Sequence, residues 1–133
     1  MEEALRALIV GDTDVTALAP ASAITWELRN GLPAVVLHLI TGPAVDMTQE
    51  GPSGLLTSTV QVNCTGSTLA EAVALARAVR AVVAGHNGGP VLHMVTVEGG
   101  GADSERGEGP VDGAKPANFH TRRLDLRVRH YDP

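Results

Sequence analysis

The feature that constrains the fold most strongly lies between residues 55 and 85. An alternating segment there leads directly into a capped helical segment. Small or apolar side chains recur at every second position over 56–64, which predicts a strand with one buried face. Next comes a capping box, in which Thr68 caps the helix and Glu71 reaches back to the cap. Apolar residues at spacings of three and four then predict a long helix, with Gly85 at its end. We therefore expect a strand–turn–helix unit at the core of the domain.

The N-terminal residues predict two short helices. Apolar side chains at spacings of three and four favour a helix that ends near Val10, and acidic residues stand at its start, where they complement the helix dipole. Asp12 or Thr13 can cap a second short helix, which Pro20 stops.

Four other segments have the composition of strands. Segments 24–28 and 34–40 are rich in β-branched residues and bounded by turn residues, so they predict two strands joined by a turn. Segments 91–98 and 119–131 predict two later strands. The elements together predict an α+β fold, a single domain over 1–133 with a mostly antiparallel sheet packed by one long and one or two short helices.

Residues 99–118 interrupt this pattern. The segment is rich in glycine, has an acidic bias and shows no periodicity. A structureless connection of that length in a small domain is usually functional or disordered. We expect a flexible loop over 99–118, which a neighbouring subunit or another protein would order.

The charge and apolar content exclude several classes of protein. The 133 residues carry 10 basic and 15 acidic side chains, a net charge of −5. Nucleic-acid binding is driven by basic residues that displace phosphate counterions, so we do not expect this chain to bind DNA tightly. Its apolar runs are shorter than the roughly twenty residues of a membrane helix. We expect an intracellular protein with no membrane partner.

The single cysteine, Cys64, is the candidate nucleophile. A thiol near a helix N-terminus can have a lowered pKa, and a nearby histidine would make it a candidate for thiol catalysis. The alternation, however, places Cys64 with Val60 and Val62 on the face that should pack against the helix. A buried cysteine behaves as a small apolar residue. The sequence favours a structural Cys64 and leaves a small thiol enzyme as the alternative.

The sequence predicts no metal or cofactor site and no catalytic set. The five histidines lie in predicted strands and a turn, without the HxH or HxxxH spacing that would bring them together on a metal. They are His38, His86, His93, His120 and His130. The glycines before Lys115 are not followed by a helical pattern, so the geometry of a phosphate-binding loop is not met.

The last predicted strand carries the strongest charge feature, four of the ten basic residues. They are Arg122, Arg123, Arg127 and Arg129. Alternation places Arg122 with the apolar residues and the other three on the opposite face. That opposite face is either a solvated surface or a contact between subunits, in which guanidinium groups pair with carboxylates of a neighbour. The segment 99–118 offers candidate partners in Asp103, Glu105, Glu108 and Asp112.

The segment GPSGLLTSTVQVNCTGSTLAEAVALARAVRAVVAG (51–85) is followed later by HTRRLDLRVRH (120–130). This combination resembles the small tail-terminator or tail-completion proteins of long-tailed phages and gene transfer agents. EEALRALIVGD near the N-terminus and LPAVVLHLITG (32–42) are similar to the opening helix and first sheet strand of that family. The resemblance covers most of the chain, but segment 99–118 is longer and richer in glycine than the family's link into the last strand.

The resemblance implies a structural virion assembly protein with no enzymatic activity. Such a protein forms a hexameric ring at the head-proximal end of the tail tube, where it ends tube polymerisation and joins the tail to the head connector. The implied partners are further copies of the chain, the tail tube protein and the head–tail connector protein. DNA would pass through the pore of the ring without sequence-specific binding. The implied location is the bacterial cytoplasm during assembly and then the virion or gene-transfer particle. A head–tail connector or stopper protein is the nearer alternative.

Overall fold

The computed structural model gives the path of most of the chain. It describes residues 1–29, 31–48, 51–84, 86–89, 91–106 and 118–131, and the side chains within these ranges except at 43–48, 51–54, 103–106 and 118. The elements in chain order are α1 (Glu2–Val10), α2 (Thr13–Leu18), the 3₁₀ turn η1 (Ala21–Ala23), β1 (Ile24–Trp26), β2 (Ala34–Thr48), β3 (Gly51–Gly66), α3 (Leu69–Ala84), β4 (Leu92–Arg106) and β5 (Asn118–Tyr131). The predicted α+β class, with one long and two short helices, is confirmed.

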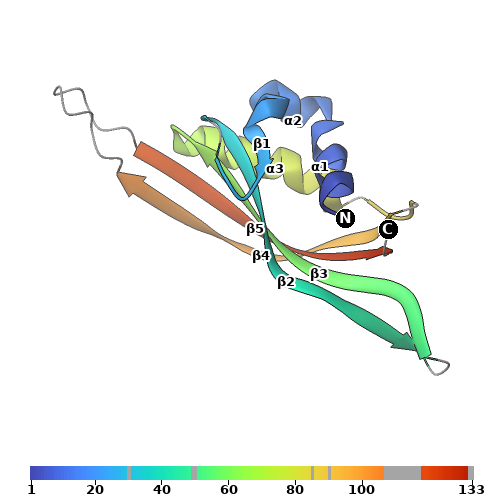
Figure 1. Cartoon of the computed structure of the whole chain (residues 1–133). Helices are drawn as coiled ribbons and strands as arrows, with labels where there is room; N and C mark the ends of the chain where they lie inside the picture. The colour runs from blue at the N-terminus through green and yellow to red at the C-terminus, as the bar shows by residue number, and fades with distance from the viewer. Residues whose placement is uncertain (30, 49–50, 85, 90, 107–117, 132–133) are drawn as a thin grey trace.

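The five strands form one sheet in the order β1-β2-β3-β5-β4. Three of the four strand pairs are antiparallel. β1 instead runs parallel to β2, with Ile24 opposite Val35, because the residues between the two strands carry the chain back to the start of β2. Helices α1, α2 and α3 gather on one side of the sheet (Figure 1). Within the described residues, the other face of the sheet has no helix over it.

The two short helices form as their capping residues predict. Asp12 caps α2, since its Oδ1 accepts hydrogen bonds from the backbone amides of Asp14 and Val15. Arg6 of α1 donates from Nε to the carbonyl oxygen of Ile24 at 2.7 Å and from a terminal nitrogen to that of Ala21 at 2.9 Å. These bonds hold the segment between α2 and β1 against α1.

The core lies between the sheet and the helices, with α3 packed across β3 and β5. Alternate side chains of β3 are buried as predicted, including Val60, Val62 and Cys64, each with no exposed surface. The fully buried stripe of α3 is Ala72, Leu75, Val79 and Val83. Burial of this apolar surface is the main stabilising contribution to the fold.

Thr68 caps α3 as predicted, whereas Glu71, expected to reach back to Thr68, bonds to Ser67. Thr68 Oγ1 accepts from the amide of Glu71 at 3.2 Å, and the Glu71 carboxylate accepts from the Ser67 hydroxyl at 3.3 Å. The helix ends at Ala84, and Gly85, which we expected to terminate it, lies outside the described residues.

The β2–β3 hairpin is longer than the sequence predicts. β2 continues through Gly42 and beyond it to Thr48, where it pairs with Gly51 of β3. The ladder accommodates the turn-like residues through register shifts after Leu39 and Thr41, so that pairing resumes beyond them. In Figure 1 this end of the hairpin projects away from the helices.

The prediction of a loop over 99–118 is wrong at both of its ends. Residues 99–106 belong to β4, which pairs with β5 as far as Arg106 opposite Asn118, and Asn118 is the first residue of β5. Pairing with β5 overrides the weak strand propensity of the glycines. A Cβ at Gly100 would collide with the carbonyl oxygen of Arg123, so the close approach of the two strands requires glycine there. Residues 107–117 lie outside the described part of the chain.

Candidate functional site

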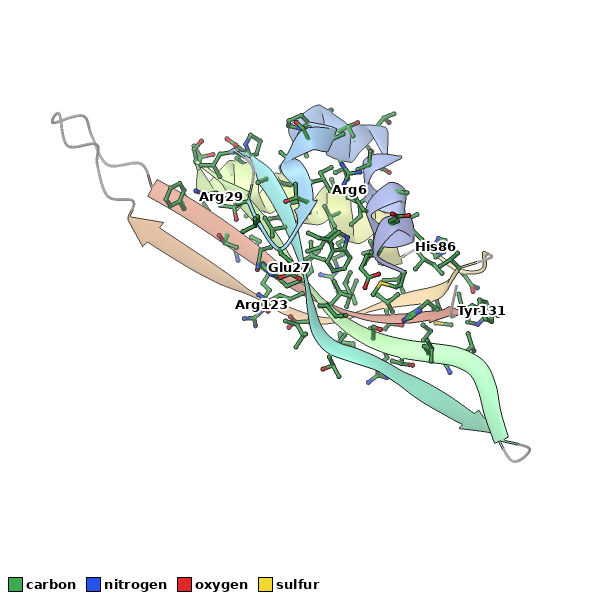
Figure 2. The ribbon with its side chains drawn as sticks, viewed as in Figure 1. Arg6, Glu27, Arg29, His86, Arg123 and Tyr131 are labelled. Carbon is green, nitrogen blue, oxygen red and sulfur yellow. The ribbon has the colours of Figure 1, made fainter. Side chains whose placement is uncertain are left out.

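The arginines of β5 lie on two faces, as the alternation predicts. Arg122 is half-buried on the helix-facing side, in register with the buried residues Leu124 and Leu126. Arg123 and Arg127 are exposed on the opposite side of the sheet. Figure 2 shows Arg123 on that side, whereas Arg6 lies among the helices.

Two of these arginines pair with carboxylates of their own chain. A terminal nitrogen of Arg127 lies 2.8 Å from Glu98 Oε1 across the β4–β5 ladder, and Arg123 Nε lies 3.3 Å from Asp125 Oδ1. All four side chains are more than a third exposed, so each pair contributes only about 0–1 kcal/mol to stability. The sequence analysis missed Glu98 as a partner, because its pairing depends on the register between β4 and β5.

The predicted acidic partners are only partly described. Asp103 lies opposite Thr121 and Glu105 opposite Phe119 in the β4–β5 ladder, so both belong to the sheet and not to a loop. Glu108 and Asp112 lie outside the described residues. Pairing of these four carboxylates with arginines of a neighbouring subunit stays a prediction.

A groove of about 610 Å³ lies between α3 and the neighbouring part of β4 and β5. Its lining from α3 is Val73, Ala76, Arg77 and Arg80, and its lining from the sheet is residues 97–102 and 122–124. The α3 residues are three or four positions apart, which places them on one stripe of the helix. The groove brings Arg122 together with two arginines that the sequence analysis did not single out.

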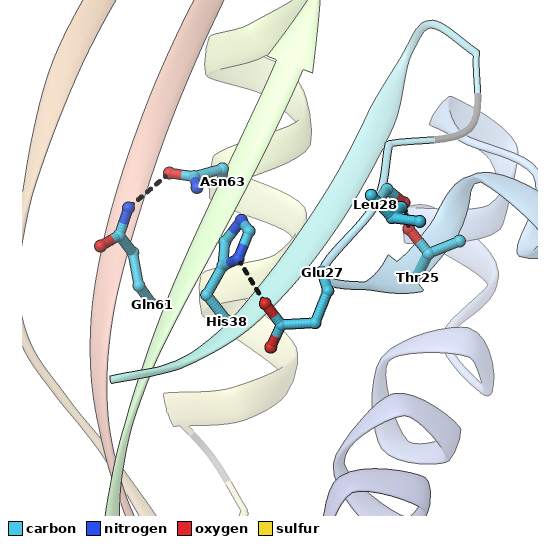
Figure 3. A network of polar contacts seen from close by, with 6 residues as sticks. All are labelled: Thr25, Glu27, Leu28, His38, Gln61 and Asn63. Atoms are coloured by element: carbon cyan, nitrogen blue, oxygen red, sulfur yellow. Dashed lines mark hydrogen bonds and ion pairs between the residues drawn. The ribbon is translucent and has the colours of Figure 1, made fainter. Parts of the chain in front are cut away.

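The open face of the sheet carries a polar network. His38 Nδ1 lies 3.2 Å from Glu27 Oε2, and Gln61 donates from Nε2 to Asn63 Oδ1 at 3.1 Å (Figure 3). These four residues and Arg123 line a hollow of about 490 Å³. Such a mixed polar surface fits contact with another protein better than binding of an apolar ligand.

Arg29 and Phe119 also line this hollow, and the guanidinium of Arg29 lies 4.5 Å from the ring centroid of Phe119. This cation–π contact holds the segment after β1 beside the start of β5.

The environment of Cys64 opposes a catalytic role. The side chain has no exposed surface, and burial raises the pKa of its thiol from 9.0 to about 12. A catalytic cysteine needs the thiolate, which a lowered pKa supplies. Near neutral pH Cys64 is therefore a protonated, buried core residue.

No cation site or membrane helix is found in the part of the chain that the structure describes. Nowhere among those residues do three or more His, Cys, Asp or Glu side chains gather as they would around a metal ion. In the same residues no helix has the length and apolar character needed to cross a bilayer.

Comparison with known proteins gives similarity at the level of fold. No protein-family model matches the sequence, and no curated protein matches it. A chain from the virion of a native gene transfer agent particle is similar in structure, with a TM-score of 0.60 and 19% sequence identity over 96% of this chain and 92% of that chain. A second solved chain aligns with 100% of this one at 20% identity, but its TM-score of 0.45 is too low to support an argument. The first similarity establishes a shared fold over nearly the whole length of both chains.

Proposed function

We propose that this protein is a structural subunit of a phage-like particle and acts as its tail terminator. The observation that carries the proposal is the fold shared with a chain of a gene transfer agent virion, which extends over 96% of this chain and 92% of the other. The sequence resemblance of segments 51–85 and 120–130 to tail-terminator proteins supports the same assignment.

In the proposed assembly, copies of the chain form a ring, hexameric as the resemblance implies, at the head-proximal end of the tail tube. A ring uses heterologous contacts that close on themselves. One face of the ring would bind the last layer of tail tube protein, and the other would bind the head–tail connector protein. The ring would thereby end tube polymerisation. A net charge of −5 suits a pore through which DNA passes without sticking.

The β2–β3 hairpin supports a role in assembly. β3 pairs with β5 only from Leu55 onward among the described strands, whereas its pairing with β2 continues to Gly51. An isolated two-stranded hairpin is only marginally stable in water. We infer that contact with a neighbouring subunit or with the tail tube stabilises this end of the hairpin.

The polar surface around β5 supports a charged contact between subunits. Arg123 and Arg127 are exposed, and their intrachain partners are exposed as well. Guanidinium groups in this state can exchange or share carboxylates with a neighbour at little cost to the fold. Arg123 and Arg127 are therefore candidate contact residues, and Arg122 and Arg129 stay candidates from the sequence alone.

Deletion of the gene tests the proposal. Particles from the deletion strain should have overlong tails or tails without heads in electron micrographs, and the gene supplied from a plasmid should restore them. Tails of normal length joined to heads would overturn the proposal.

Gold labelling of the protein in intact particles separates the tail terminator from a head–tail connector or stopper. A label at the end of the tail tube supports the terminator, whereas a label on the portal side of the joint supports the connector.

A further inference from the structure

The groove between α3 and the sheet has an excess of positive charge. Arg77 and Arg80 are exposed on the α3 side, and Arg122 enters from β5. The carboxylate in the lining, Glu98, is bound to Arg127 at 2.8 Å and is therefore already partly neutralised. The lining thus holds four guanidinium groups, those of Arg77, Arg80, Arg122 and Arg123, against the single carboxylate of Glu98. One of the four, Arg123, is already paired with Asp125 of its own strand.

Arg122 adds a half-buried charge to the lining of the groove. Its Nε atom is shielded from solvent and has no hydrogen-bond partner within the described part of the chain. Most buried polar atoms in folded proteins have a partner, and leaving a charged donor without one is costly. Because Nε itself is closed to solvent, a ligand in the groove would instead meet the rest of this half-buried guanidinium.

The shape of the groove fits an extended chain. One wall is the β4 run Gly99–Gly101, which has no side chains to fill the space, and β4 is an edge strand of the sheet. A second hollow of about 400 Å³ shares Arg80 and Val97 with the groove, so it adjoins the groove along α3 and β4. An edge strand beside such a path can pair with an added peptide strand.

We propose that the groove between α3 and β4 binds an extended peptide segment of a partner protein whose side chains carry carboxylates. Guanidinium groups bind carboxylates through paired, charge-assisted hydrogen bonds, and Arg77, Arg80 and Arg122 line the same groove. A nucleic-acid backbone fits less well, because the basic groups line a groove between a helix and a strand in a chain of net charge −5. The inference goes beyond the proposed function, since the site belongs to a single copy of the chain.

Fluorescence anisotropy on the purified protein tests this site without assembly of a particle. The probe is a short fluorescein-labelled peptide of alternating Glu and Ser, with its Gln-for-Glu counterpart as the neutral control. We expect the acidic peptide to bind in low salt and the neutral peptide to bind far more weakly. Arg80→Gln, at an exposed position, and Arg122→Gln should each raise Kd about tenfold, as expected for the loss of one charge-assisted bond.

Arg29→Gln is the matched control, because it makes the same change of charge at an exposed arginine outside the groove. It should leave Kd unchanged, and circular dichroism should show that all variants are folded. The proposal is overturned if the acidic peptide does not bind, if Arg29→Gln weakens binding as much as Arg80→Gln, or if a labelled single-stranded oligonucleotide binds the groove more tightly than the peptide. None of these results depends on whether the protein terminates a tail.

Discussion

The Oγ of Ser58 lies 2.8 Å from the Nε2 of His130, and both side chains are buried between β3 and β5. Ser58→Ala removes this hydrogen bond and leaves the buried imidazole nitrogen without it, so we expect the free energy of unfolding to fall by about 1–3 kcal/mol. Urea denaturation measures the change. Ser67→Ala removes an exposed hydroxyl and should cost less; equal losses in the two variants would contradict a buried, energetically important bond.

Arg6 joins α1 to the segment before β1. Arg6→Met keeps most of the aliphatic stem but removes the bonds to the carbonyl oxygens of Ala21 and Ile24, which lie at 2.9 and 2.7 Å. We expect a loss of about 1–3 kcal/mol in urea denaturation, because two backbone acceptors lose a charged donor. Arg80→Met, at an exposed position on α3, is the control and should change stability by less than about 0.5 kcal/mol. If Arg6→Met has the same free energy of unfolding as the unsubstituted protein, water replaces the guanidinium at the two carbonyl oxygens with no loss of stability.

Gly100 is a position where the backbone of β4 closely approaches that of β5. A Cβ there would collide with the carbonyl oxygen of Arg123, whereas a Cβ at Gly42 meets nothing within 4 Å. We expect Gly100→Ala to lower the free energy of unfolding by about 1–3 kcal/mol and Gly42→Ala to leave it nearly unchanged. If the two variants unfold alike in urea, β4 and β5 are not paired as described.

The sequence predicted the centre of the fold because local signals and tertiary packing agree there. The alternation before Cys64 and the stripe from Ala72 to Val83 both describe faces that pack on one another, and both are buried. The capping residues Asp12 and Thr68 mark helix starts by hydrogen bonds within a few residues, so their effect is visible in the sequence.

The sequence could not predict features that depend on pairing between distant strands. Gly99 and its neighbours have weak strand propensity, yet β4 continues through them because β5 supplies hydrogen bonds. The pairing of Glu98 with Arg127 and the meeting of Arg80 with Arg122 in one groove also depend on long-range register. For the candidate site, the alternation gave the faces of the β5 arginines but not the residues that surround them.

Burial of Cys64 makes stability sensitive to alkaline pH. The pKa of the thiol is raised from 9.0 to about 12 in the folded protein, so the folded state favours the protonated form. The protonated thiol contributes fully to the free energy of unfolding below about pH 9. This contribution is lost as pH rises toward about 12, at up to roughly 1.4 kcal/mol per pH unit. Cys64→Ala should reduce this slope in unfolding measurements between about pH 9 and pH 12. Rapid alkylation of the native protein by iodoacetamide near neutral pH would contradict the burial.

Substitution of Arg127, which pairs with Glu98, allows an effect on assembly to be measured separately from an effect on folding. Both side chains are more than a third exposed, so Arg127→Gln should lower the free energy of unfolding by no more than about 1 kcal/mol. If β5 also contacts a neighbouring subunit, as we propose, the same substitution should reduce the number of tails that carry the protein, because a lost contact is repeated around the ring. Urea denaturation and quantitative immunoblotting of purified tails measure the two effects. Glu3→Gln, at an exposed position of α1, changes one charge away from the sheet, and its tails should carry the normal amount of protein. Normal incorporation of Arg127→Gln would remove Arg127 from the proposed contact, whereas a large loss of stability would assign it a role in the fold.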